Sequence, residues 1–200
     1  MGCDIHMITE IRKNGKWERV LEIPETLKSR NYSVFAFLAD VRNSWDINGF
    51  KPKGLPEDIS GLTFDKDEDE DEEDYYKIDF REENSDYHSH SWLTLKELQE
   101  ADKSDFLYTK IKVDKEFIDK FFEFGGKMPE QMEIIDYTPN TLVDMFYYAY
   151  QPNVIIRWKS VKESELKNIS IFEGIKELEE IAEKYDVDNE NIRIVFAFDN

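Results

Sequence analysis

The N-terminal stretch CDIHMITEIRKNGKWERVLEI constrains the fold of this chain most, because apolar and polar residues alternate on both sides of Asn14 and Gly15. Asn-Gly is the dipeptide that most readily adopts the positive φ angles of a two-residue hairpin turn. The pattern predicts a β-hairpin whose strands cover about residues 3 to 13 and 16 to 22. An antiparallel pair of strands is therefore expected to open the chain.

Further strand patterns lie at about residues 75 to 80 (YYKIDF), 153 to 161 (NVIIRWKSV) and 191 to 199 (NIRIVFAFD). Helix patterns lie between and beside them. Thr94 and Glu97 have the spacing of a capping box, and Asp114 is a cap whose helix would stop at Gly125 and Gly126. Helices are accordingly predicted at about residues 94–101, 114–124, 139–150 and 171–185. Residues 32–43 fit either a helix or a buried strand by periodicity, and the shared face of Phe35, Leu38 and Ala39 favours the helix.

Strands at both ends of the chain with helices between them predict an α+β fold. We expect the N- and C-terminal strands to share one mixed or antiparallel sheet. A chain of 200 residues with 40% hydrophobic residues is the right size for one core. The prediction is therefore a single domain covering residues 1–200.

An acidic run at residues 65–74 (DKDEDEDEED) contains nine acids and one lysine. Because like charges repel and no apolar residue interrupts them, the run is expected to be a solvated, mobile loop insertion. It lacks the glycine and the twelfth-position glutamate of an EF-hand, so a calcium site is disfavoured. The net charge of the whole chain is -19, which disfavours direct binding to nucleic acid or to an anionic membrane.

The cellular location is predicted from absent signals. The single cysteine, Cys3, excludes an intramolecular disulfide, and no secretory signal is recognisable. The longest apolar runs are far shorter than a membrane span. The expectation is a soluble, cytoplasmic protein without a membrane partner.

Cys3 alternates to the strand face opposite Asp4 and His6, which predicts burial as a small apolar residue.

All three histidines occur in two short stretches, GCDIH and DYHSHSW. On an extended strand, side chains two residues apart point the same way, so Asp4 would project with His6, and Asp86 with His88 and His90. If the two stretches meet, the residues Asp4, His6, His88 and His90 form a ligand set for a divalent metal ion, Zn²⁺ first. Such an ion would activate a water molecule for hydrolysis.

Two other interpretations of the histidines remain open. They can form a hydrogen-bonded polar cluster without a metal, with Ser91 capping the following helix, or they can be unrelated surface residues. In the metal interpretation, Asp86 or Asp40 has the catalytic role of orienting a histidine or accepting a proton.

The arginines in RNY and DVRN predict an anion site. Arg42 offers a bidentate fork for phosphate or carboxylate, and Arg30 and Asn43 complete the predicted substrate-binding set. The alternative is an ordinary pairing of Asp40 with an arginine at the end of a buried element.

The segments MGCDIH, RNYSVFAFLADVRN, GLPEDIS, DYHSHSWLTLKEL and IRIVFAFDN together resemble a family of uncharacterised proteins of bacteriophages and bacterial genomes. The similarity covers both ends and the middle of the chain. It implies a phage or prophage setting and supplies no activity. The acidic run is a variable insertion relative to the family pattern.

The sequence thus leads to three functional hypotheses. The first is a metal-dependent hydrolase that acts on a nucleotide or phosphodiester. The second is a non-catalytic, phage-encoded protein that sequesters a nucleotide signal or inhibits a host factor. The third is an acidic decoy that imitates nucleic acid, which is disfavoured because decoys spread their carboxylates over a rigid face. In the first two, the expected partner is a small anionic ligand.

Overall fold

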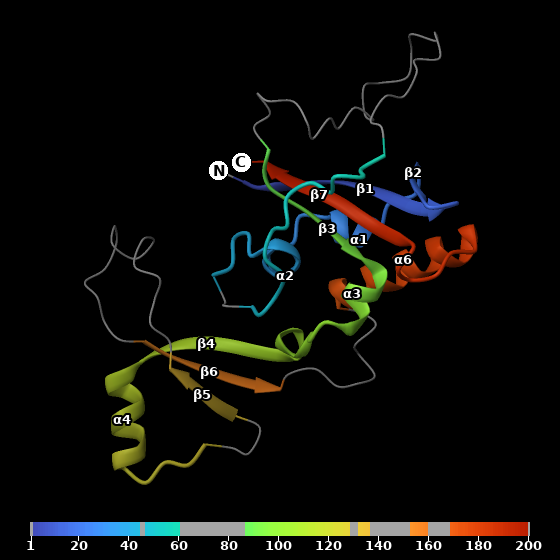
Figure 1. The fold of residues 1–200 in the computed structure, drawn as a ribbon. Coiled ribbons are helices and arrows are strands. Elements are labelled where there is room, and N and C mark those ends of the chain that lie inside the picture. The colour runs from blue at the N-terminus through green and yellow to red at the C-terminus, as the bar shows by residue number, and fades with distance from the viewer. Residues whose placement is uncertain are drawn as a thin grey trace. The chain divides into compact units, whose positions relative to one another are not determined.

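The computed structural model describes residues 2–44, 47–60, 87–128, 132–136, 153–159 and 169–199. The fold is α+β, as predicted, and the chain's contacts divide it into two compact units (Figure 1). Unit 1 comprises residues 1–102 and 167–200, and unit 2 comprises residues 103–166. The sequence predicts one domain, and the structure groups its residues into two units that each contain an antiparallel sheet.

The sheet of unit 1 has four strands in the order β2-β1-β7-β3. These are β1 (Asp4–Lys13), β2 (Lys16–Val20), β3 (His88–Thr94) and β7 (Ile192–Asp199). Asn14 and Gly15 turn the β1–β2 hairpin with φ angles of 52° and 78°. The predicted hairpin and the predicted pairing of N- and C-terminal strands are both confirmed.

One face of this sheet is covered by helices, and we call it the helix face. Phe196 and Phe198 of β7 lie on this face, and the ring centroid of Phe35 is 5.1 Å from that of Phe198. Because paired residues share a face, His88 and Ser91 also lie on it. The helices of unit 1 are α1 (Glu25–Lys28), α2 (Tyr32–Ala39), α3 (Leu95–Glu100) and α6 (Ser170–Tyr185).

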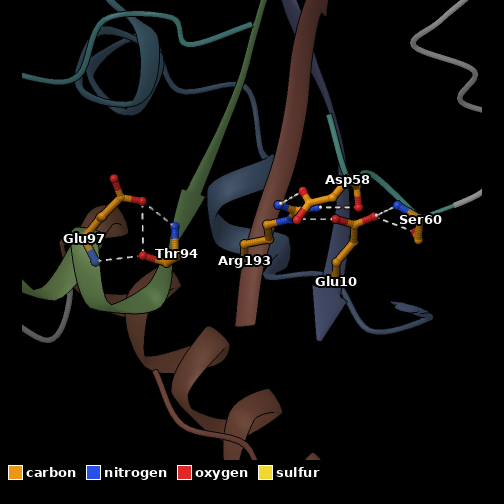
Figure 2. A network of polar contacts seen from close by, with 6 residues as sticks. All are labelled: Glu10, Asp58, Ser60, Thr94, Glu97 and Arg193. Carbon is orange, nitrogen blue, oxygen red and sulfur yellow. Dashed lines mark hydrogen bonds and ion pairs between the residues drawn. The ribbon is translucent and has the colours of Figure 1, made fainter. Parts of the chain in front are cut away.

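The helices predicted near residues 32, 94 and 171 are confirmed as α2, α3 and α6. Thr94 and Glu97 form the predicted capping box at the start of α3 (Figure 2). Ser91, the other candidate cap, instead lies inside β3, where its hydroxyl accepts a hydrogen bond from the Lys53 N–H at 3.2 Å. Helix α1 packs closely on α6, because a Cβ atom at Gly174 would lie 2.4 Å from Leu27 Cγ.

The opposite face is covered by residues 55–60 and is called the loop face. Ile8, Val195 and Ala197 form its buried core, against which Leu55, Ile59, Tyr87 and Trp92 pack. A buried ion-pair network holds the loop in place (Figure 2).

In this network, Arg193 Nε lies 2.7 Å from Glu10 Oε2, and Arg193 Nη1 lies 2.9 Å from Asp58 Oδ1. The Ser60 N–H donates to Glu10 Oε1 at 2.7 Å. Arg193 and Glu10 are only 2% and 0% exposed, and the Arg193 guanidinium lies 4.0 Å from the Trp17 ring centroid. Residues 58 to 60 are thus attached to β1 and β7 through the buried side chains of Glu10 and Arg193.

Unit 2 contains a short 3-10 helix (Ser104–Leu107), β4 (Tyr108–Asp114), α4 (Lys115–Glu123), β5 (Met132–Asp136) and β6 (Asn153–Lys159). Its strands are antiparallel in the order β4-β6-β5. The predicted cap is confirmed, since the Asp114 carboxylate accepts a hydrogen bond from the Glu116 N–H at 2.8 Å. Gly125 follows the helix with a φ of 76°, as a helix stop requires.

Several predictions fall outside the described residues: the acidic loop at 65–74, the strand at 75–80, Asp86 and the helix at 139–150. Within the described ranges, the helices are all too short or too polar to cross a lipid bilayer.

Candidate functional site

The polar residues at the end of the sheet where β1 begins and β7 ends form the candidate site. We call Asp4, His6, Arg30, Tyr87 and Asp199 the His6 cluster. The register brings them together, because Asp4 pairs with Asp199 and His6 pairs with Ala197. Alternation then places His6 and Asp199 on the same face of the sheet, the loop face.

His6 and Asp199 form a hydrogen-bonded pair at the centre of the cluster. His6 Nε2 lies 3.0 Å from Asp199 Oδ2, and the second carboxylate oxygen accepts the Asp4 N–H at 3.2 Å. The His6 ring centroid is 4.8 Å from that of Tyr87, with the planes tilted by 56°. The side chains of His6 and Asp199 are 30% and 36% exposed, so a small molecule has access to the pair.

Arg30 closes the cluster through two hydrogen bonds to the Asp4 carboxylate. Nε donates to Oδ1 at 2.6 Å, and Nη2 donates to Oδ2. These hydrogen bonds from Arg30 hold the pKa of Asp4 below its usual value. Gly2 permits the approach of the guanidinium, because a Cβ atom there would lie 3.0 Å from Arg30 Nη1.

His88 lies on the opposite face from His6. It pairs with Phe198, and their rings stack with centroids 6.1 Å apart. Ser89 has a φ of 53°, and the register shifts between His88 and Ser91, which identifies a β-bulge. The prediction that His88 and His90 project together from an extended strand is wrong, because this bulge breaks the alternation.

His90 lies on the loop face. It is two residues from Trp92, the partner of Val195, and residues two apart in a strand share a face. It lies on the other side of β7 from His6. Burial, and then the nearby His88, lower the pKa of His90. His90 therefore favours its neutral form.

The predicted metal ligands Asp4, His6, His88 and His90 are thus collected at one end of one sheet but on both of its faces. Asp4 is bound to Arg30, and His88 faces the helices. Among the residues that the structure describes, no group of three or more His, Cys, Asp or Glu side chains is arranged to hold a metal ion. A bound divalent metal, zinc first, stays a prediction.

Cys3 is buried on the helix face, as predicted, with 1% exposure. Burial raises the pKa of its thiol, while a hydrogen bond to Arg42 opposes the rise. A thiol held in its neutral form is a poor nucleophile.

Asp40 and Asn43 have structural partners. Asp40 adopts a left-handed conformation (φ 58°) as the C-cap of α2, and its carboxylate binds Lys51 and the Asn43 amide. The amide of Asn43 also bonds both the N–H and the C=O of Ile47, at 2.8 and 3.0 Å. These contacts hold the turn after α2, and the catalytic role of Asp40 and the substrate-binding role of Asn43 stay predictions.

Asp199 and Tyr87 are the members of the cluster that sequence analysis missed. A signal for Asp199 was present: it ends the last alternating strand, and Asp4 opens the first. Antiparallel pairing of the two strands over their full length brings these ends together.

Comparison of the chain with protein-family models, with curated proteins and with solved structures gave no match. The resemblance to the phage and bacterial family therefore stays a prediction.

Proposed function

We propose that this protein is a hydrolase of a small anionic substrate, a nucleotide or other phosphodiester, and that His6 and Asp199 are its acid–base pair. The hydrogen bond between the His6 ring and the Asp199 carboxylate carries the proposal. Imidazole exchanges protons near neutral pH, which is why it serves most often as a general acid or base.

The hydrogen bond to the carboxylate orients the imidazole. With Nε2 bonded to Asp199, Nδ1 is the nitrogen that takes a proton from an attacking water or gives one to a leaving group. The partial exposure of both side chains supports access of water and substrate to this nitrogen.

Arg30 supplies the preference for an anion. Its guanidinium already binds a carboxylate in the bidentate geometry that also suits a phosphate. Because the side chains of Arg30 and Asp4 are 55% and 49% exposed, a substrate oxyanion can replace Asp4 without unfolding any element.

Turnover of bis(p-nitrophenyl) phosphate and of a nucleotide panel tests the acid–base pair. His6→Gln and Asp199→Asn are each expected to lower kcat about 100-fold or more, the usual contribution of a positioned acid–base group. His88→Gln is the matched control, because it removes a histidine from the opposite face, and it should stay within about threefold of wild type. Activity of His6→Gln within that range would refute the acid–base role.

The same assays separate the alternatives. A nucleotide that binds tightly and is recovered unaltered would favour the non-catalytic binding protein. Elemental analysis of protein prepared without a histidine tag tests the predicted divalent metal. Stoichiometric metal that is lost equally in His6→Gln and His88→Gln would favour a metal site and would contradict a metal-free acid–base pair.

A further inference from the structure

A cavity of about 650 Å³ lies beside the last turns of α6, and we call it the α6 cavity. It is formed where the end of β1, the end of α6 and the loop between α6 and β7 meet. The His6 cluster lies at the opposite end of β1, so the two sites are separate. A volume of about 300–1,000 Å³ is usual for the binding site of a small molecule. The α6 cavity therefore has room for a small ligand.

Hydrogen bonds between three elements hold the walls of this cavity in place. The loop between α6 and β7 is tied to β1, because the Arg12 N–H donates to the Asn191 carbonyl at 2.7 Å. The side chain of Gln99 in α3 accepts a hydrogen bond from the Asn189 amide at 2.7 Å and donates one to Glu179 of α6 at 2.6 Å. Walls that are already fixed lose less conformational freedom when a ligand binds.

Charged side chains of both signs line the α6 cavity without pairing with one another. The cations are Arg12 and Lys13 of β1, and the carboxylates are those of Glu179, Glu183, Asp186 and Asp188. Within the part of the chain that the structure describes, neither cation forms an ion pair with any of these carboxylates. Elsewhere on α6 the charges do pair, as Lys176 with Glu180 and Lys184 with Glu22. The cavity thus keeps apart charges that the adjacent surface brings together.

The two cations are positioned by aromatic rings instead of by carboxylates. Lys13 Nζ lies 5.4 Å from the centroid of the Tyr185 ring, and Arg12 Cζ lies 5.9 Å from that of Trp17. A ring contact orients a cation through its face and consumes no N–H donor. Ammonium and guanidinium groups carry three and five such donors, which are therefore available to an incoming oxyanion.

The balance of charge in the lining indicates which ligand fits. Its carboxylates outnumber its cations by two, and an adjoining cavity of about 480 Å³ adds Glu100 and Glu190 against Lys96. An anion would be repelled by this balance, and a simple cation would leave the two basic side chains unmatched. A zwitterion with one additional positive charge matches both. Its carboxylate would meet Arg12 or Lys13, and its two cationic groups would meet the carboxylates of α6 and the loop.

We propose that the α6 cavity binds a basic amino acid, arginine or lysine. The ligand reaches the site from solvent, since Arg12, Lys13, Glu183, Asp186 and Asp188 are all exposed. The inference goes beyond the proposed function and does not depend on it. Binding of the amino acid and turnover of a phosphodiester are measured separately, so either can fail without the other.

Isothermal titration of the full-length protein with L-arginine, agmatine and L-citrulline tests the ligand class. Agmatine lacks the carboxylate of arginine, and citrulline lacks its side-chain charge. Each is expected to bind at least about fivefold more weakly than arginine, the upper value for loss of one partly exposed ion pair. Agmatine that binds as tightly as arginine would overturn the proposal, because an acidic protein attracts any cation. Equal binding of citrulline, or no binding of arginine and lysine, would overturn it as well.

Two variants locate the binding on opposite walls. Lys13→Gln removes a cation, and Asp186→Asn removes a carboxylate while keeping a residue that tolerates the φ of 54° at this position. Each is expected to weaken arginine binding about fivefold or more. The matched controls remove the same charges outside the cavity: Lys16→Gln in the hairpin and Glu180→Gln on α6, which should both stay within about twofold of wild type.

Circular dichroism verifies that each variant is folded. If Lys13→Gln and Asp186→Asn both bind arginine within about twofold of wild type, the α6 cavity is not the site. If the two controls weaken binding as much as the cavity variants do, the effect reflects net charge, and the proposal fails equally.

Discussion

Removal of the Glu10 carboxylate tests the buried network that attaches residues 58 to 60 to the sheet. In Glu10→Ala, Arg193 keeps its charge and its burial but loses its 2.7 Å partner. The Ser60 N–H loses its acceptor at the same time. Asp58 remains within 2.9 Å of Arg193, but its side chain is 64% exposed, so solvent screens that pair.

Breaking a buried ion pair from one side typically destabilises a protein by about 3–5 kcal/mol, because an unpaired charge stays buried. The remaining Asp58 contact places the expected loss of unfolding free energy at the lower end, about 3 kcal/mol. For a chain of this size, that change lowers Tm by about 6–12 °C.

Urea unfolding followed by tryptophan fluorescence measures the loss. The rings of Trp17 and Trp92 lie 4.0 and 5.4 Å from the Arg193 guanidinium, so the signal reports on this part of unit 1. Glu18→Ala is the control, since it removes an exposed carboxylate from β2 and should change stability by less than about 0.5 kcal/mol.

The double variant Glu10→Ala/Arg193→Met tests whether the loss of stability comes from the unpaired buried charge of Arg193. Once the orphaned charge is removed as well, the double variant should be more stable than the sum of the two single losses predicts, by at least about 1 kcal/mol. A loss below about 1 kcal/mol in Glu10→Ala, or strict additivity in the double variant, would refute the argument that Arg193 depends on Glu10.

Three further predictions concern packing, capping and pH. Gly49→Ala should lower the unfolding free energy by about 1–3 kcal/mol in a thermal melt, because its Cβ would lie 2.3 Å from the Phe37 carbonyl oxygen; an unchanged Tm would contradict this close approach. Thr94→Ala removes the cap of α3 and should cost about 1 kcal/mol in urea unfolding, with Thr94→Ser close to wild type. The pKa of His90 is lowered in the folded protein, so its contribution to stability is full above its ordinary pKa and is lost as pH falls below it; His90→Gln should flatten that part of the stability profile, and a parallel profile would contradict the burial argument.

The local structure of unit 1 was largely predictable from short-range signals. Asn14-Gly15 specifies the hairpin, Thr94 and Glu97 specify the start of α3, and alternation specifies β7. Each signal acts within a few residues, so it needs no knowledge of the rest of the fold.

The candidate site was predictable only in part, because it depends on register. Side-chain alternation correctly placed Cys3 away from His6, but the left-handed Ser89 shifts β3 and separates His88 from His90. Serine carries no strong preference for that conformation, so the bulge has no sequence signal. The partner of His6 is 193 positions away, and pairing at that distance depends on the whole sheet.

The central place of β7 has a consequence for the order of assembly during synthesis. Every residue from Ile192 to Phe198 is buried, and β1 and β3 meet only through this strand, so the sheet is incomplete until the ribosome has released residues near 199. Until then, the early hairpin exposes an unpaired edge for the whole time that about 170 intervening residues are translated. A chaperone that shields strand edges would therefore act on the nascent β1, and the yield of folded protein should fall when translation stalls before β7 emerges.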